Sequence, residues 1–234
     1  KATNMATRYS PKIVTDGLML CLDPANSRSY SGSGTTLTDL TGNGYNGTLT
    51  NGVAFNSLDQ GCISFDGYDD YIDLGSQSGD LRLSGSNGTI SVWMYMEDVS
   101  SGDSWKRMVD KSNGGNGANG YTFFVHTDGT LTGNVNTSGL SSSAGAITDD
   151  EWFHVIYAWD GTVHYLYKDG SLLHSVSNTA LPPSDTTNMR IGSWNHSTAR
   201  EFKGRISQVC IWNRKLSAAE IQQNYNALKG RFNK

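Results

Sequence analysis

The sequence predicts an all-β fold, a jelly-roll sandwich of two antiparallel sheets with one short C-terminal helix. Three observations support this prediction: short segments of alternating apolar and polar residues, Asp-Gly pairs between them, and 27 glycines with only 17% charged residues. Asp-Gly pairs supply the positive φ angles of hairpin turns, and two facing sheets bury the apolar side of each strand. A sandwich of 234 residues is commonly one domain. We therefore expect an N-terminal arm over 1–16 and a single domain over 17–234.

The first half of the chain contains four strand-like segments that are separated by turn formers. Their ranges are 17–23, 62–65, 71–74 and 89–96. In the last of them every second residue is apolar, which predicts that Ile90, Val92, Met94 and Met96 share one face. Between the first two segments, residues 39–49 place turn formers around small apolar anchors.

The strongest strand pattern lies in the second half. Residues 152–176 contain three strand-like segments joined by Asp160-Gly161 and by Lys168-Asp169-Gly170, which predicts a meander of three antiparallel strands. Further strands are expected over 121–126, 130–136, 188–193 and 205–212. Near the C-terminus, Ser217 and Glu220 form a capping-box pattern, and Ile221, Tyr225 and Leu228 share one face of a helix expected over 217–229, which Gly230 ends.

The charge of the chain and its cysteines limit its partners and its compartment. The net charge is −4 without runs of like charge, so neither nucleic acid nor a membrane is expected as a partner. Cys21, Cys62 and Cys210 each lie in an apolar, strand-like segment, which favours three buried thiols made in a reducing compartment. The alternative is a disulfide between Cys21 and Cys210, because terminal strands could pair.

Three stretches resemble the laminin-G-like, concanavalin A-like lectin/glucanase superfamily. They are Phe65–Gly75, Trp152–Gly170 with its Trp-Phe-His-Val start, and Phe202–Ile221. The resemblance implies a concanavalin A-like sandwich, and it leaves the function open because such folds serve lectins, enzymes and structural modules. Residues 9–48 look like the opening of such domains in tailed-bacteriophage structural proteins. That resemblance implies a virion protein, assembled in the host cytoplasm, present in many copies and bound to other capsid or tail proteins.

Catalysis is not expected. Glycosidases need two carboxyl groups about 5–9 Å apart, and glucanases of this superfamily often carry them at alternating positions of one strand. The glutamates are Glu97, Glu151, Glu201 and Glu220, and only Glu151 has an acidic residue two positions away, in the run Asp149-Asp150-Glu151 that is typical of a solvated turn. His154 lies in the Trp-x-His-Val pattern, where the resemblance implies a structural role. A glycan hydrolase is therefore only a distant alternative.

Two binding sites are candidates. Asp69 and Asp70 match the acidic pair of calcium-binding relatives. In those relatives the other ligands come from a loop before the closing strand, where this chain has Asn195 and Glu201 but lacks the relatives' acidic cluster. The alternative is that Asp66, Asp69 and Asp70 only shape the turn. No cofactor is thus required, and calcium is possible.

For a glycan, the candidate residues are Trp194, Asn195, His196, Tyr68 and Trp105, because sugars stack on exposed rings beside polar groups. The alternative for Trp194 is that it packs onto the edge of the sandwich.

Two functions follow from these observations. The first is a non-enzymatic virion structural protein, on the capsid surface or tail, with weak and multivalent glycan binding as an addition. The alternative is an adhesin module that attaches the particle to cell-surface glycans of a host.

Overall fold

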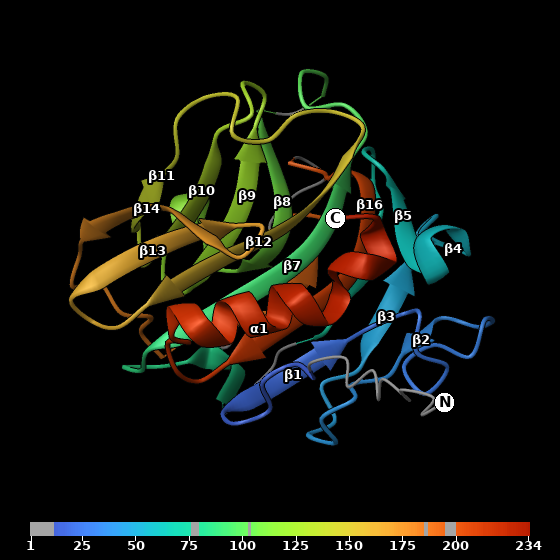
Figure 1. Ribbon diagram of the computed structural model, residues 1–234, viewed down its shortest axis with the longest axis horizontal. Coiled ribbons are helices and arrows are strands. Elements are labelled where there is room, and N and C mark those ends of the chain that lie inside the picture. The colour runs from blue at the N-terminus through green and yellow to red at the C-terminus, as the bar shows by residue number, and fades with distance from the viewer. Residues whose placement is uncertain (1–11, 76–79, 103, 185–186, 195–199) are drawn as a thin grey trace, which may run out of the picture.

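The computed structural model describes residues 12–75, 80–102, 104–184, 187–194 and 200–234. In these residues two antiparallel sheets of eight strands each face one another across an apolar core, and one α-helix crosses the outer face of one sheet (Figure 1). The predicted all-β sandwich with a short C-terminal helix is therefore confirmed. No helix in the described ranges is long and apolar enough to cross a membrane.

The helix-covered sheet, called sheet A, contains the predicted meander at one edge. In spatial order its strands are β14 (Ser171–Ser177), β13 (Val163–Lys168), β12 (Glu151–Trp159), β7 (Gly88–Met96), β16 (Lys203–Trp212), β5 (Cys62–Asp66) and β4 (Ala54–Asn56), and β1 (Leu18–Leu22) also pairs with β16. The pairing of β16 with β1 brings the two ends of the described chain together. Along β7, Ile90, Val92, Met94 and Met96 face the core between the sheets, as predicted.

The opposite sheet, called sheet B, supplies the other wall of the core. Its strands in spatial order are β11 (Ser138–Ser141), β10 (Leu131–Val135), β9 (Tyr121–His126), β8 (Trp105–Lys111), β15 (Arg190–Ile191), β6 (Tyr71–Asp73), β3 (Gly47–Thr50) and β2 (Thr36–Leu37). The strand expected over 188–193 is only two residues long. The prediction for 39–49 was incomplete, since part of β3 lies there.

Strand β8 was not predicted, because four of its seven residues are charged. All four are nonetheless buried in the middle of sheet B. The ammonium of Lys106 donates to the carbonyl of Val99 at 2.9 Å, and that of Lys111 donates to the carbonyl of Thr187 at 2.6 Å. These long side chains reach loop carbonyls while their methylene stems stay packed, which makes a charged strand compatible with burial.

Helix α1 (Ala218–Leu228) begins as predicted. The side chain of Ser217 accepts from the backbone N–H of Glu220, and the Glu220 carboxylate accepts from the backbone N–H of Ser217. Ile221 is buried against sheet A together with Leu216. Gly230 does not end the helical path, because a 3-10 turn, η4 (Lys229–Phe232), continues the chain and buries Phe232.

An aromatic stack joins η4 and α1 to the outer face of sheet A. The ring of Trp93 lies 4.3 Å from that of Phe232, 4.8 Å from that of His154 and 5.8 Å from that of Tyr225, measured between centroids. His154 is buried, and its Nε2 is 2.8 Å from the Ser91 hydroxyl. The structural role inferred for His154 is thus confirmed. Burial lowers the pKa of His154 to about 3.

Because His154 is buried, the free energy of unfolding should decrease as the pH is lowered below about 6.5, the usual pKa of an unfolded histidine. The unfolded chain takes up the His154 proton there, whereas the folded protein remains neutral down to a pKa of about 3. His154 should therefore reduce the free energy of unfolding by up to about 1.4 kcal/mol for each pH unit below 6.5.

Urea unfolding of the natural protein between pH 7 and pH 5 measures this slope. The double variant His154→Phe/Ser91→Ala keeps an aromatic ring and should have a much flatter profile. His174→Gln, at an exposed histidine, is the control and should keep the natural slope. Equal slopes for the double variant and the natural protein would contradict the assignment to His154.

Candidate functional site

Three chain segments converge at one end of sheet B. The register pairs Ile191 with Ile72 on β6 and with Val109 on β8, so the start of β6, the start of β8 and the segment after β15 lie at the same end. These segments carry Tyr68, Trp105 and Trp194, which the sequence analysis selected as glycan-binding residues. Asn195 and His196, selected with them, lie outside the described residues.

The chain leaves β15 through residues 192–194 and enters β16 through residues 200–202, which contact the start of β8. Gly192 has φ of +90°, and a Cβ there would lie 2.3 Å from a ring carbon of Phe65, so only glycine fits. The backbone N–H of Phe202 donates to the Gly192 carbonyl at 2.8 Å, and that of Arg107 donates to the Arg200 carbonyl at 3.0 Å. These bonds fix the backbone of Arg200 and that of Gly192, two residues before Trp194.

Arg200 joins two of the selected aromatic residues. Its guanidinium lies 4.0 Å from the ring centroid of Trp194 and 4.8 Å from that of Trp105. Trp194 is half-buried, and its stacking on Arg200 agrees with the alternative that it packs at the edge of the sandwich. Trp105 remains 37% exposed, so part of its ring can still contact a ligand.

A second arginine adjoins the same site. The guanidinium of Arg190 lies 4.0 Å from the ring centroid of Tyr71, and its Nη1 donates to the Trp194 carbonyl at 3.2 Å. We call the five residues of this site the Trp–Arg cluster: Tyr71, Trp105, Arg190, Trp194 and Arg200.

Two guanidinium donors of the Trp–Arg cluster have no acceptor in the described part of the chain. Within the described part of the chain, the Nε of Arg190 and the Nη1 of Arg200 are buried and make no hydrogen bond. Buried donors of this kind are rare in folded proteins and point to an acceptor from water, an ion or a ligand. The cluster therefore combines aromatic rings with cationic donors that can accept an anion.

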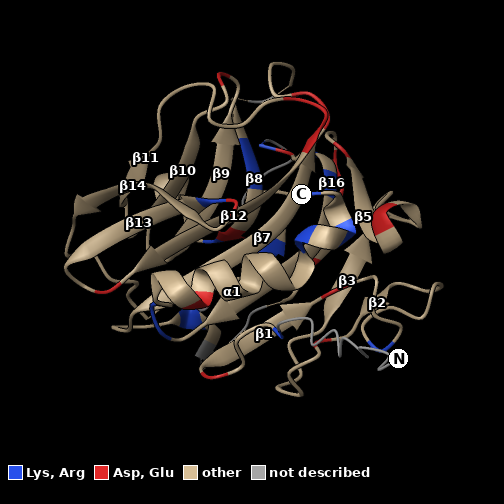
Figure 2. Cartoon of the chain, viewed as in Figure 1, with Lys and Arg blue, Asp and Glu red and all other residues tan. Residues whose placement is uncertain are grey.

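Buried charged residues of β8 lie next to the Trp–Arg cluster, since Asp110 is the register partner of Arg190. A bulge between Arg107 and Val109 directs Val109 into the core and places Arg107 on the outer face, 4.0 Å from the ring centroid of Phe124. The Nε of Arg107 is 3.5 Å from a carboxylate oxygen of Asp110. Burial raises the pKa of Asp110 to about 6, against the opposing effect of Arg107. Figure 2 shows basic residues, in blue, on β8.

The acidic turn between β5 and β6 has the structure of the turn-shaping alternative. Oxygen atoms of Asp66, Asp69 and Asp70 lie within 4.8 Å of one another. The Asp70 carboxylate accepts from the backbone N–H groups of Gly52 and Asp66, each at 2.8 Å, and burial raises its pKa. Tyr68 projects from this turn and is 78% exposed.

The remaining residues of the predicted calcium site are not brought into this group. Glu201 is buried and lies outside the acidic group that the described residues form, and Asn195 lies outside the described residues. Calcium at this turn therefore remains a prediction.

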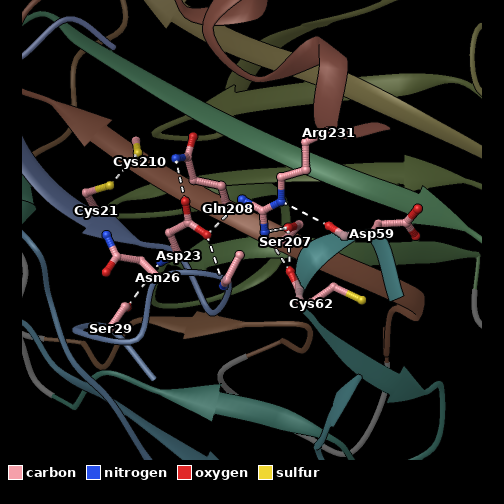
Figure 3. A network of polar contacts seen from close by, with 12 residues as sticks. Cys21, Asp23, Asn26, Ser29, Asp59, Cys62, Ser207, Gln208, Cys210 and Arg231 are labelled. Carbon is pink, nitrogen blue, oxygen red and sulfur yellow. Dashed lines mark hydrogen bonds and ion pairs between the residues drawn. The ribbon is translucent and has the colours of Figure 1, made fainter. Parts of the chain in front are cut away.

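A groove of about 750 Å³ lies elsewhere, between the Asp23–Ser27 turn and the C-terminal end of α1. Arg231 beneath it donates from Nη1 to Asp23 at 2.9 Å, from Nη2 to the Gly61 carbonyl at 2.6 Å and from Nε to the Asp59 carbonyl at 3.1 Å (Figure 3). All three nitrogens of this guanidinium are satisfied within the protein. Its role is to hold the C-terminal turn, and the Trp–Arg cluster is the stronger binding candidate.

Sequence reasoning found Tyr68, Trp105 and Trp194 but missed Arg190, Arg200 and Tyr71. Each tryptophan was visible as an aromatic residue in a polar loop. The two arginines acquire their importance only from contacts between segments distant in the sequence, and no local pattern marks them.

Comparison with known proteins gives one family and several structures of the same fold. Residues 66–222, more than half of the chain, match the model of the concanavalin A-like lectin/glucanases superfamily. Adhesion G-protein coupled receptor V1 of Danio rerio is 29% identical over 154 residues, which are 60% of this chain and 2% of the receptor. The chain thus spans a very small part of that relative.

The similar solved structures include a toxin domain and an enzyme. The botulinum neurotoxin serotype D binding domain has a TM-score of 0.65 at 17% identity, over 90% of this chain and 51% of that chain. The binding domain of botulinum neurotoxin DC in complex with SialylT has a TM-score of 0.66 at 15% identity, over 91% and 52%. Trypanosoma rangeli sialidase has a TM-score of 0.68 at 14% identity, over 95% and 34%. At these identities the likeness shows the fold alone, whereas the sequence match decides the family: the chain belongs to the concanavalin A-like lectin/glucanase superfamily.

Proposed function

We propose that this domain is a non-enzymatic binding module that holds glycans carrying an acidic group at the Trp–Arg cluster. One observation carries the proposal: Arg200 lies between two tryptophan rings and has a buried donor without an acceptor in the described structure. A carboxylate or sulfate of a sugar would supply that acceptor.

The chemistry of the cluster fits such a ligand. The C–H face of a sugar packs on an aromatic ring, and Trp105 and Tyr68 are the exposed rings at this end of sheet B. A guanidinium forms charge-assisted hydrogen bonds with a carboxylate, which are roughly twice as strong as neutral ones. The adjacent Arg190 adds a second cation and a second unfilled donor. An acidic glycan would thus be favoured over a neutral one at this site.

The similar structures support a glycan as the ligand class. One toxin binding domain is described in complex with SialylT, and another similar structure is a sialidase. A binding role is favoured over hydrolysis, because Asp110, the register partner of Arg190 on β8, is fully buried and adjoins Arg107. A group in that setting stabilises the strand and is not placed to protonate a glycosidic oxygen.

The proposal predicts that the domain binds a sialylated oligosaccharide more tightly than the same oligosaccharide after enzymatic removal of its sialic acid. Arg200→Gln should weaken binding of the acidic form at least roughly tenfold, because it removes a charge-assisted hydrogen bond. Trp105→Ala should weaken both forms, since it removes the stacking surface. Isothermal titration calorimetry measures both effects.

Arg205→Gln is the matched control, because Arg205 also stacks on an aromatic ring, that of Tyr95 at 3.7 Å, but on sheet A. It should bind the acidic glycan as the natural protein does. Equal binding of acidic and neutral glycans, or no effect of Arg200→Gln, would contradict the site. Hydrolysis of a glycan that is lost in Asp110→Asn would contradict the non-enzymatic role.

The virion location remains a separate proposal that rests on the resemblance of residues 9–48. The comparisons give a receptor, toxin domains and a sialidase, so they lend it no support. Mass spectrometry of purified phage particles from a producing host should detect this chain in many copies. Its absence from intact particles would leave the glycan-binding role without the virion context.

We also propose that the fold does not require calcium, because backbone N–H groups already donate hydrogen bonds to the carboxylates of Asp66 and Asp70. EDTA should leave the melting temperature of the protein unchanged, and Asp69→Asn should not alter that result. Asp70→Ala should lower the melting temperature with or without EDTA, since two backbone donors lose their acceptor. A melting temperature that falls in EDTA and recovers with calcium but not magnesium would show a bound calcium ion instead.

A further inference from the structure

Two of the three cysteines lie opposite each other on the strands that join the ends of the domain. In the antiparallel pair of β1 with β16, Cys21 is the register partner of Cys210. Their sulfur atoms are 3.2 Å apart, and both residues are buried, at 3% and 1% exposure (Figure 3). We propose that Cys21 and Cys210 are a modification site, at which an intrachain disulfide forms when the domain meets a disulfide oxidant.

The backbone already has the geometry that a disulfide needs. Directly opposite residues of an antiparallel pair have Cα atoms about 4.5–5.5 Å apart, and disulfides join Cα atoms about 4.4–6.8 Å apart. The sulfurs need to approach by roughly 1 Å to reach the S–S bond length of about 2.05 Å. The pairs Leu20–Ile211 and Leu22–Val209 on either side hold the register while they do so.

Formation of the bond is a two-electron oxidation. A thiolate of one cysteine attacks oxidised glutathione, which releases one glutathione thiol and leaves a mixed disulfide. The second cysteine thiolate then attacks that mixed disulfide, releases the second glutathione thiol and closes the Cys21–Cys210 bond. The two cysteines thereby lose two protons and two electrons in total, and the glutathione disulfide gains the same number.

Access controls the rate of this reaction. Both sulfurs are buried, and burial raises the pKa of Cys210, so little thiolate is present in the folded protein. Strand β1 pairs with β16 on one edge, and on the other edge the backbone of Cys21 bonds to Asp39 and Leu40. Both sets of bonds must open before an oxidant reaches the two sulfurs. Oxidation should therefore be slow in the folded protein and fast during refolding.

Cys62 provides an internal control within the same chain. It is also buried, but its sulfur lies 3.7 Å from the Asn56 carbonyl and 3.8 Å from the Leu58 carbonyl. These backbone groups cannot form a disulfide, so Cys62 should remain a thiol.

Refolding the purified natural protein with oxidised glutathione tests the proposal. Thiol titration in denaturant should fall from three thiols per chain to one, and peptide mapping by mass spectrometry should identify Cys21 joined to Cys210. The bond closes a loop between positions 189 residues apart, so the melting temperature should rise by at least about 5 °C and return after treatment with dithiothreitol.

Variants separate the cysteines. Cys210→Ser should form no intrachain disulfide, and its melting temperature should be the same with and without the oxidant. Cys62→Ser keeps both paired cysteines and should form the bond as the natural protein does. Peptide mapping of the natural protein decides the question even if Cys210→Ser fails to fold. Three thiols remaining after oxidative refolding, a bond that includes Cys62, or an oxidised protein of lower melting temperature would overturn the proposal.

Discussion

The stacking of Trp93 with His154 and Phe232 is the interaction on which the arrangement of this domain depends. A sandwich of two sheets has two outer faces, and an outer face that exposes aromatic residues over a wide area invites association. Here the C-terminal helix and the turn after it cover the aromatic residues of sheet A. Arg231 holds that turn through Asp23 and two backbone carbonyls. The middle of sheet A is thereby covered, and we propose the end of sheet B as the site of ligand recognition.

Sheet B differs from sheet A, because it buries charged residues and no α-helix of the described chain covers it. Lys106 and Lys111 reach loop carbonyls, and Arg107 lies between the Phe124 ring and Asp110. These contacts satisfy the ammonium groups of β8 within the protein. Arg190 and Arg200, beside Trp194, each keep a buried donor that makes no hydrogen bond in the described structure, which places a capacity for an anion at this end of sheet B.

The fold was largely predictable from the sequence, because periodicity and turn chemistry are local. The β7 alternation, the meander after Trp152 and the capping box at Ser217 each depend on residues within one short segment. Strand β8 escaped because its burial depends on carbonyls supplied by distant loops. The site was predictable only in part for the same reason: Trp105 and Trp194 were conspicuous, whereas Arg200 gains its role from contacts with both rings that no local pattern indicates.

Arg200 and Arg205, which both stack on aromatic rings but beside opposite sheets, show why contact type alone does not define a site. Arg205 on sheet A lies 3.7 Å from the Tyr95 ring and also approaches Asp59 and Glu97, so its charge is balanced by nearby carboxylates. Arg200, beside the start of β8 in sheet B, has two rings next to it and no ion pair with a carboxylate among the described residues. A guanidinium without a counter-charge attracts an anion, whereas a neutralised one does not. The difference in local charge, and not the stacking itself, therefore favours sheet B as the surface for an acidic ligand.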